Sequence, residues 1–286
     1  MSINILVVLY GKEIDHSLTI RSLYKINHDF NLVIYNNGPE LVSFENDFFS
    51  YPDKTNSSVK IVQDLKNSPL SIIYNNFLEG CFFDVADFNI ILDDDSNLPI
   101  NYFENLNENI DVHLPIIKNK NGKVFYPSIN SKAVSSLVKV NESDIVFSIG
   151  SGLIISKHLI EVFCHHKIKI FNERFSLYGV DFSFFRNVIH LKKIGCHVNF
   201  AIKSYLIHDL SYDGREMSFF RDKERKFDFI LSYKIYSEDN LFYKYIWLAK
   251  FIVRNCFLSK VNRINNIKFI PLYCWVFYTG KHPNCK

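Results

Sequence analysis

Three consecutive aspartates, Asp93-Asp94-Asp95, follow the apolar run Phe88 to Leu92. The run is short and rich in Ile, so it is predicted to form a buried strand. Three carboxylates at the exit of one strand repel one another, and a divalent cation can neutralise that repulsion. Oxygen ligands favour Mg²⁺ or Mn²⁺, and such a cation commonly holds a diphosphate. A solvated acidic turn at the end of a strand would explain the same triplet without a metal.

Other polar residues are expected at the same edge of a sheet. The pattern predicts strands over 3–9, 32–35, 59–62 and 88–92, with helices over 16–24 and 68–83 between them. Strands that alternate with helices indicate an α/β fold with a mostly parallel sheet and helices on both faces. Ligands of such sheets bind beyond the carboxyl ends of the strands. Tyr10-Gly11 and Asn36-Asn37 follow the first two strands, so we expect them to share a site with the aspartates.

The second half of the chain carries a small-residue segment and two polar residues at the ends of predicted elements. Gly150-Ser151-Gly152 permits a close backbone approach to a ligand, although a tight turn explains these small residues equally well. Asp181 precedes a helix predicted from Phe182, where it would serve as the helix N-cap. His208 ends the last predicted strand, over 196–207, where it would have a structural role.

Charge divides the chain into an acidic body and a basic tail. The net charge is +3, which by itself implies no nucleic-acid partner. Eight Lys and Arg but no Asp or Glu lie between Asn240 and Lys286, so the preceding residues carry a net negative charge. The six Cys are scattered without a Cys-x-x-Cys pair, which gives no support to zinc or thioredoxin-like chemistry. Reduced thiols in a cytosolic protein are the expectation.

No segment has the pattern of a leader or a membrane span. The first residues lack a basic leader and a small-residue cleavage site, so they are predicted to form a strand rather than a signal peptide. Spanning a bilayer takes roughly 20 apolar residues. The longest candidate, Phe269 to Gly280, has 12 residues and contains Pro271.

An ordered series of motifs resembles a known family. The chain is similar to GT-A glycosyltransferases of the inverting family 2 type, found in bacterial O-antigen and capsule synthesis, over roughly Ile3 to Tyr212. The resemblance implies a GT-A domain over 1–215 and a basic, aromatic-rich helical segment over 216–286. The motifs that carry it are the first strand, Tyr35-Asn36-Asn37-Gly38, the segment from Asn67 through Asn75, Asp93-Asp94-Asp95, Gly150-Ser151-Gly152, Tyr178-Gly179-Val180-Asp181 with Arg186, and His208.

The resemblance assigns the metal site. The family's Asp-x-Asp motif maps onto Asp93 and Asp95, where the first meets the ribose or a metal-bound water and the last binds the metal. Alternate carboxylates on an extended strand point the same way, so Asp93 and Asp95 can share a cation while Asp94 faces elsewhere. Asp94 is then expected to contact hydroxyls of the donor sugar. His208 matches a histidine that completes the metal site in many such enzymes.

The resemblance also assigns a catalytic base and a nucleotide site. Asp181 matches the base, and inverting transfer needs one such carboxylate to deprotonate the acceptor hydroxyl. The family often has an acidic residue just before it, where this chain has Val180. Tyr10, Asn37 and Asn67 are expected to contact the nucleotide-sugar together with Asp93 and Asp94. An Asn-Asn-Gly turn is the alternative reason for Asn37.

The implied function is metal-dependent transfer of a hexose, from UDP-glucose or UDP-galactose, to a hydroxyl of an undecaprenyl-diphosphate-linked saccharide. It would take place at the inner face of the bacterial plasma membrane. The alternatives are a dTDP-rhamnose or UDP-galactofuranose transferase and a nonenzymatic nucleotide-sugar-binding subunit of the same fold. The aromatic, basic stretch Leu241 to Lys260 would lie on anionic lipid, or pack as a helix with a solvated basic edge. A dinucleotide-dependent dehydrogenase is disfavoured, because only Gly11 follows the first strand where Gly-x-Gly-x-x-Gly is required.

Overall fold

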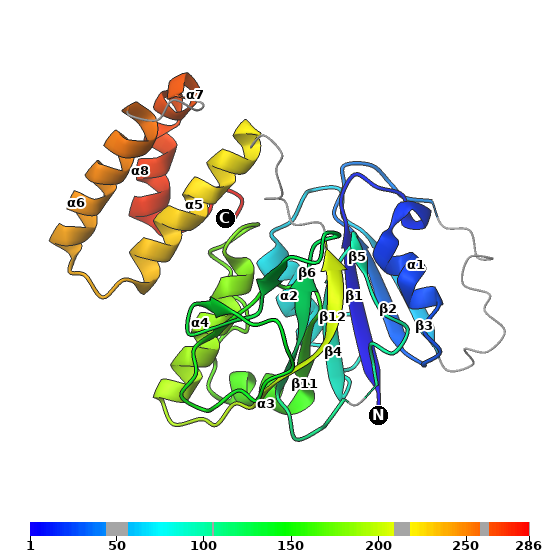
Figure 1. Ribbon diagram of the computed structural model, residues 1–286. Coiled ribbons are helices and arrows are strands. Elements are labelled where there is room, and N and C mark those ends of the chain that lie inside the picture. The colour runs from blue at the N-terminus through cyan, green and yellow to red at the C-terminus, as the bar shows by residue number, and fades with distance from the viewer. Residues whose placement is uncertain (44–56, 105, 209–217, 258–262, 286) are drawn as a thin grey trace. The chain divides into compact units, whose positions relative to one another are not determined.

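The computed structural model forms two compact units (Figure 1). The structure describes residues 1–43, 57–104, 106–208, 218–257 and 263–285. We call the first the sheet unit, which comprises Met1–Ser68, Ile72–Phe171 and Asp181–Ser211. The second, the helical unit, comprises Pro69–Ser71, Asn172–Val180 and Tyr212–Lys286. The predicted domain boundary between 215 and 216 lies outside the described residues.

Four parallel strands form the first half of the main sheet, as predicted. In the order β3-β2-β1-β4 they are Ser58–Gln63, Asn31–Asn36, Ile3–Leu9 and Phe88–Asp93. Continuous apolar runs such as that of β1 are typical of strands buried on both faces. Ile5 and Val7 of β1 pack in one core cluster with Ile20 and Leu23, while Leu6, on the opposite face, is also fully buried. The predicted α/β class is therefore confirmed.

The second half of the sheet is mixed, whereas a mostly parallel sheet was predicted. The short strand β11 (Leu153–Ser156) runs antiparallel between β4 and β6 (Val112–Lys118). Strand β12 (Phe200–His208) is parallel to β6. The reversal of β11 between them leaves β6 and β12 pointing in the same direction as β4. The carboxyl ends of β1, β2, β4 and β12 consequently meet at one edge of the sheet.

Short strands complete the sheet unit. β5 (Ser96–Asn97) pairs with the end of β12, and β7 (Val124–Tyr126) pairs with the end of β6. A separate three-stranded sheet has the order β10-β8-β9, with β10 at Val146–Phe147, β8 at Ser128–Ile129 and β9 at Lys132–Ala133.

The helices of this part of the chain begin and end where polar and small residues interrupt the apolar pattern. The helix predicted over 16–24 is a 3-10 turn, η1 (Ile14–His16), followed by α1 (Leu18–Tyr24), with Ser17 as the N-cap that accepts from the Ile20 N–H at 3.2 Å. The helix predicted over 68–83 is shorter, α2 (Leu70–Leu78), and Gly80 follows it with φ +81°. Helices α3 (Lys157–His165) and α4 (Val180–Lys193) follow β11.

The C-terminal helical extension of the predicted fold is present. It consists of α5 (Phe219–Tyr236), α6 (Leu241–Ile252), the π-helical turn η3 (Val253–Phe257), α7 (Arg263–Lys268) and α8 (Ile270–Thr279). Phe227 and Tyr273 are fully buried and meet edge to face, and Glu224 pairs with His282 inside the unit at 2.9 Å. Across the described ranges, we find no helix with the length and apolar character needed to cross a membrane.

Candidate metal and catalytic site

The aspartates form a tight turn rather than the extended strand exit expected from the sequence. Asp93 is the last residue of β4, Asp94 and Asp95 make the turn, and β5 begins at Ser96. The start of α1 holds this turn in place. The Ser17 hydroxyl donates to the Asp94 carbonyl at 2.8 Å, and the Thr19 hydroxyl accepts from the Ser96 N–H at 2.9 Å. Asp93 and Asp95 therefore converge because the chain reverses between them.

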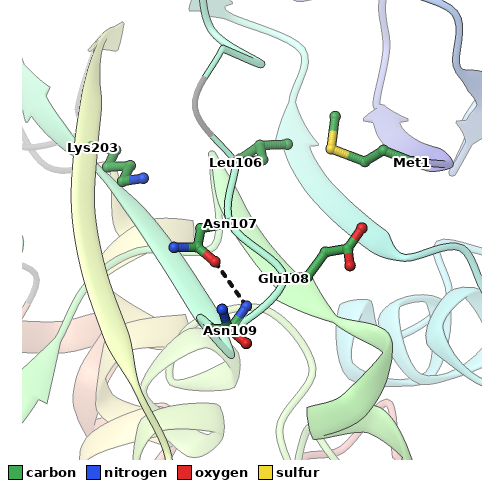
Figure 2. Close-up of a pocket in the computed structure, with 6 residues that line it drawn as sticks. All are labelled: Met1, Leu106, Asn107, Glu108, Asn109 and Lys203. Atoms are coloured by element: carbon green, nitrogen blue, oxygen red, sulfur yellow. Dashed lines mark hydrogen bonds between the residues drawn. The ribbon is translucent and has the colours of Figure 1, made fainter.

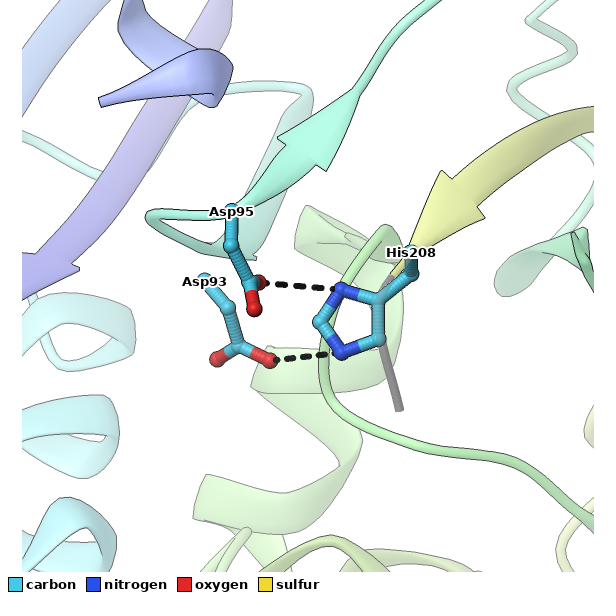
Figure 3. A group of neighbouring side chains, drawn as sticks. All are labelled: Asp93, Asp95 and His208. Carbon is cyan, nitrogen blue, oxygen red and sulfur yellow. Dashed lines mark ion pairs between the residues drawn. The ribbon is translucent and has the colours of Figure 1, made fainter. Parts of the chain in front are cut away.

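His208 joins the two aspartates because of strand pairing. It is the last residue of β12, and its register partner across the sheet is Ser96, the residue after Asp95. His208 Nδ1 lies 3.1 Å from Asp95 Oδ1, and His208 Nε2 lies 3.7 Å from Asp93 Oδ2 (Figure 3). One ligand atom from each of these three residues lies within 4.8 Å of the others. The sequence-predicted metal ligands are thus brought together.

The three side chains fit a divalent cation. Asp95 Oδ1 is buried and accepts no hydrogen bond within the part of the chain that the structure describes, although His208 Nδ1 lies 3.1 Å away. A buried carboxylate oxygen without a donor is costly unless a cation or water satisfies it. Two carboxylates and one imidazole are a ligand set that Mn²⁺ or Mg²⁺ accepts, and the nitrogen favours Mn²⁺. Asp93, Asp95 and His208 are the residues that would hold it.

The electrostatics of the group reflect crowded negative charge. Burial, with the neighbouring Asp95 and Asp94, raises the pKa of Asp93 to about 6. Burial also acts to raise the pKa of Asp95, but the adjacent His208 outweighs it and the net pKa is lowered. For His208, burial lowers the pKa, and the facing carboxylates of Asp95 and Asp93 reverse this to a net increase. The protein alone thus supplies only part of the positive charge that the site needs.

Asp94 is directed to a different partner. Its carboxylate pairs with Lys12 Nζ at 2.9 Å. Burial raises the pKa of Asp94 in spite of this lysine. Asp94 is not one of the three residues whose ligand atoms converge. The Lys12 ion pair now occupies the carboxylate for which a donor-sugar contact was expected.

Asp181 approaches the same site from α4. It lies in the first turn of the helix, which begins at Val180, and not ahead of the helix as an N-cap would. A Cβ at Gly150 would lie only 2.5 Å from Asp181 Oδ1, so the glycine lets the carboxylate rest against the backbone. The charge of Asp181 also contributes to the raised pKa of His208, so the two side chains lie within electrostatic range of each other.

Tyr74 was not anticipated from the sequence. It is 1% exposed, and burial raises its pKa well above the ordinary value, with further increases from Asp93 and from Asp181. Tyr74 therefore lies within electrostatic range of both the candidate metal ligand Asp93 and the candidate base Asp181. On α2 it follows the apolar spacing of a core residue, so no sequence signal distinguished it.

The glycine motifs serve contacts within the protein. Gly152 has φ +84°, and a Cβ there would lie 2.8 Å from the Tyr102 hydroxyl. Between the two glycines, the Ser151 hydroxyl accepts from the Asp93 N–H at 3.1 Å. The close backbone approach expected at Gly150-Ser151-Gly152 is therefore made to other side chains of the chain.

The predicted nucleotide contacts divide into buried and exposed residues. Asn37 is 3% exposed; its amide donates to the Ser68 carbonyl at 3.0 Å, and its Oδ1 accepts from the Ser68 N–H at 2.8 Å. Asn67 adjoins it, with φ +52° and 3.4 Å from Asn37 Nδ2 to Asn67 Oδ1. Asn37 thus anchors the 67–68 segment to the end of β2. Tyr10 is 56% exposed just beyond β1, so its ring is accessible to a ligand.

Two cavities lie at different ends of the sheet unit. One of about 200 Å³ adjoins the aspartate turn and is lined by Leu18, Asp95, Asn97, Lys120 and Ile207. A larger one of about 530 Å³ lies beside Met1, just before β1, and residues 106–109, which precede β6; Figure 2 shows the side chains that line it. It is lined by Met1, Leu106, Asn107, Glu108, Asn109 and Lys203.

Comparison with known proteins gives likenesses among solved structures only. No protein-family model and no curated protein matches the chain. Among solved structures, the crystal structure of GalNAc-T7 with UDP, GalNAc and Mn²⁺ is similar with a TM-score of 0.46 and 10% identity. The likeness covers 89% of this chain but only 57% of that one.

Proposed function

We propose that the protein is a metal-dependent, inverting glycosyltransferase. One observation carries the proposal: two carboxylates and an imidazole converge at the carboxyl edge of the sheet. Asp181 is a further carboxylate, whose charge acts on His208. That edge is where α/β sheets bind their ligands. The buried Asp95 oxygen without a donor supports a cation at this point.

The proposed reaction assigns a role to each residue. Asp93, Asp95 and His208 hold Mn²⁺ or Mg²⁺, which when bound neutralises charge on the nucleotide diphosphate leaving group. Asp181 takes the proton of an acceptor hydroxyl as that oxygen bonds to the anomeric carbon. The bond from the anomeric carbon to the diphosphate oxygen breaks on the opposite face, so the configuration inverts. A single basic carboxylate suffices, in contrast to the carboxylate pair of retaining hydrolases.

For the substrates, we propose a UDP-hexose donor, UDP-glucose or UDP-galactose, and an undecaprenyl-diphosphate-linked saccharide acceptor of bacterial surface polysaccharide synthesis. dTDP-rhamnose and UDP-galactofuranose are the alternative donors. These assignments rest on the family resemblance of the motifs. The exposed ring of Tyr10 and the small cavity beside Asp95 are consistent with a ligand at this edge.

A lipid-linked acceptor would require the protein to reach a membrane surface, and the helical unit has residues suited to this. Phe242 of α6 is 69% exposed, Val253 and Phe257 of η3 are also exposed, and Lys250 and Arg254 are exposed between them. No acidic residue occurs from Asn240 onward, so this part of the chain would present no negative charge to anionic lipid. We propose that this face binds the inner leaflet of the plasma membrane.

Vesicle sedimentation tests the membrane role. The full chain should sediment with vesicles containing phosphatidylglycerol and not with pure phosphatidylcholine. Phe242→Ser with Phe257→Ser should release it, whereas Leu137→Ser, which changes a 67% exposed residue of the sheet unit, should not. Equal sedimentation of all three proteins would remove this part of the proposal.

A transfer assay tests the catalytic proposal. The protein is incubated with UDP-, GDP- and dTDP-sugars, a lipid-linked saccharide extract and Mn²⁺ or EDTA. We expect a glycosylated product with one donor class only, dependent on the metal, with the anomeric configuration opposite to that of the donor. Retention of configuration would contradict the assigned mechanism. Metal-dependent donor binding without transfer or donor hydrolysis would instead favour a nonenzymatic binding subunit.

A further inference from the structure

The two ring nitrogens of His208 have different surroundings. Nδ1 lies 3.0 Å from the Ser96 hydroxyl oxygen and 3.1 Å from Asp95 Oδ1. Nε2 has the longer contact, 3.7 Å to Asp93 Oδ2. Ser96 is fully buried, so water does not compete for its hydroxyl. Which nitrogen carries the proton is decided by these neighbours, because a neutral imidazole has one donor and one acceptor nitrogen.

A chain of buried hydroxyls continues beyond Ser96. Its oxygen lies 2.7 Å from the Ser151 hydroxyl oxygen, which also accepts the Asp93 N–H at 3.1 Å. Ser151 is 1% exposed and stands between Gly150 and Gly152, whose close packing fixes its place. The two serines therefore link the imidazole to the backbone of the first aspartate of the site.

The direction of this chain follows from Asp95. An ionised carboxylate only accepts hydrogen bonds, so a lone pair on Nδ1 would face a negative oxygen at 3.1 Å. A proton on Nδ1 removes that repulsion and donates to the Ser96 oxygen. The Ser96 hydroxyl then donates to Ser151, whose oxygen accepts both this bond and the Asp93 N–H. If the hydrogen bonds ran in the opposite direction, the Ser96 hydroxyl would donate to His208 Nδ1. The lone pair of Nδ1 would then remain 3.1 Å from the Asp95 carboxylate.

We propose that Ser96 and Ser151 are positioning residues that hold His208 with the proton on Nδ1 and so make Nε2 the metal-binding nitrogen. The tautomer follows from the hydrogen bonds alone, and the ligand role of Nε2 rests on the proposed metal-dependent function. Residues behind a metal-binding histidine typically fix its ring in this way, and their loss weakens metal affinity. Ser96 and Ser151 themselves bind neither metal nor substrate.

The tautomer is tested first, on metal-free protein. In the full-length chain labelled with ¹⁵N-histidine, long-range nitrogen–proton spectra at alkaline pH distinguish a protonated Nδ1 from a protonated Nε2. His208 should show the proton on Nδ1 in the wild type, with a loss of this preference in Ser96→Ala. A wild-type signal with the proton on Nε2 would overturn the proposal, whatever the protein catalyses.

Manganese binding, measured by electron paramagnetic resonance without any donor sugar, tests the consequence. Ser96→Ala should weaken Mn²⁺ binding about 10–100-fold. Ser148→Ala is the matched control, because that hydroxyl is also fully buried but has no hydrogen-bond partner among the described residues. Melting temperatures of both variants show whether either is misfolded. Equal Mn²⁺ affinity of the two folded variants would refute the positioning role.

A pair of substitutions at His208 identifies the ligand nitrogen directly. The amide oxygen of Gln can occupy the place of Nε2, and that of Asn the place of Nδ1. His208→Gln should therefore bind Mn²⁺ more tightly than His208→Asn, and the reverse order would contradict the assignment to Nε2. If the wild type itself bound no Mn²⁺, the metal-dependent function would fail, while the nitrogen spectra would still decide the tautomer.

Discussion

The two ends of the sheet unit offer different kinds of site. At the amino end lies the larger cavity, about 530 Å³, with one acidic and one basic side chain among its lining residues. At the carboxyl end the cavity is only about 200 Å³, but Asp93 at the end of β4, Asp95 in the turn after it and His208 at the end of β12 come together there. Convergent titratable groups with perturbed pKa values indicate function more strongly than empty volume does. Matched substitutions at the two ends can therefore test whether function depends on the carboxyl end rather than on the larger cavity.

The largest effect is expected from Asp181→Asn at the carboxyl end. The amide keeps the shape of the carboxylate but cannot take a proton, so transfer should fall about 10²–10⁴-fold. Mn²⁺ and donor binding should be nearly unchanged. The matched change at the amino end is Glu108→Gln, on an exposed residue of the larger cavity, which should leave the rate within about twofold. Transfer near the wild-type rate in Asp181→Asn would assign the base elsewhere.

Asp95→Ala should act on donor binding. A ligand that binds only the folded state raises the melting temperature, so donor with Mn²⁺ should stabilise the wild type. We expect this stabilisation to disappear in Asp95→Ala and to persist in Glu108→Gln. A donor-induced rise of equal size in both variants would show that the converging carboxylates do not hold the donor through a cation.

Gly150→Ala should have an intermediate effect, through position alone. The new Cβ would lie 2.5 Å from Asp181 Oδ1, and the φ of Gly150 lies outside the left-handed region, so the backbone itself accepts alanine. Moving a catalytic group by about 1 Å can cost about 10²-fold in rate. Gly122→Ala reverses the situation, because φ is +78° but nothing lies within 4 Å of the new atom. It should lower the melting temperature and leave the specific activity unchanged; an equal loss of activity in both would mean that contact with Asp181 is irrelevant.

The sequence predicted the strands and the polar residues at their ends better than it predicted how these residues meet. Apolar runs such as that of β4 are local signals, and parallel strands bring their carboxyl ends to one edge. By contrast, the pairing of His208 with Ser96 depends on residues more than 100 positions apart. The hydrogen bonds from Ser17 and Thr19 to the aspartate turn also join residues far apart in the sequence. The sequence therefore predicted an extended chain after β4, where the structure has a turn.

The same limit applies to Asn37 and Gly150. The position of Asn37 after β2 predicts a nucleotide contact. The three-dimensional structure reveals that its side-chain amide nitrogen and oxygen both form hydrogen bonds with the backbone of Ser68. The residue type of Gly150 predicts a close approach to a ligand, whereas in the structure its close neighbour is the Asp181 side chain. In both cases the residue type restricts the possible roles, and a long-range partner selects among them.

The smallest expected effect is a change in the pH dependence of stability caused by Asp93. Its pKa of about 6 is higher than that of an unfolded aspartate, about 3.9. Between these values the folded chain binds a proton that the unfolded chain does not, so this residue makes the free energy of unfolding fall as the pH rises. Asp93→Asn removes the contribution. In metal-free protein the melting temperature of the variant, relative to wild type, should therefore rise between about pH 4 and pH 7.

Asp15→Asn is the control, because that carboxylate is 60% exposed on η1. Its melting temperature relative to wild type should not show this rise. Mn²⁺ should then raise the melting temperature of the wild type at pH 7 more than that of Asp93→Asn, since a cation supplies the charge that protonation supplies at lower pH. If the melting temperatures of Asp93→Asn and wild type changed equally with pH and with Mn²⁺, charge repulsion would destabilise the carboxyl end no more than the amino end.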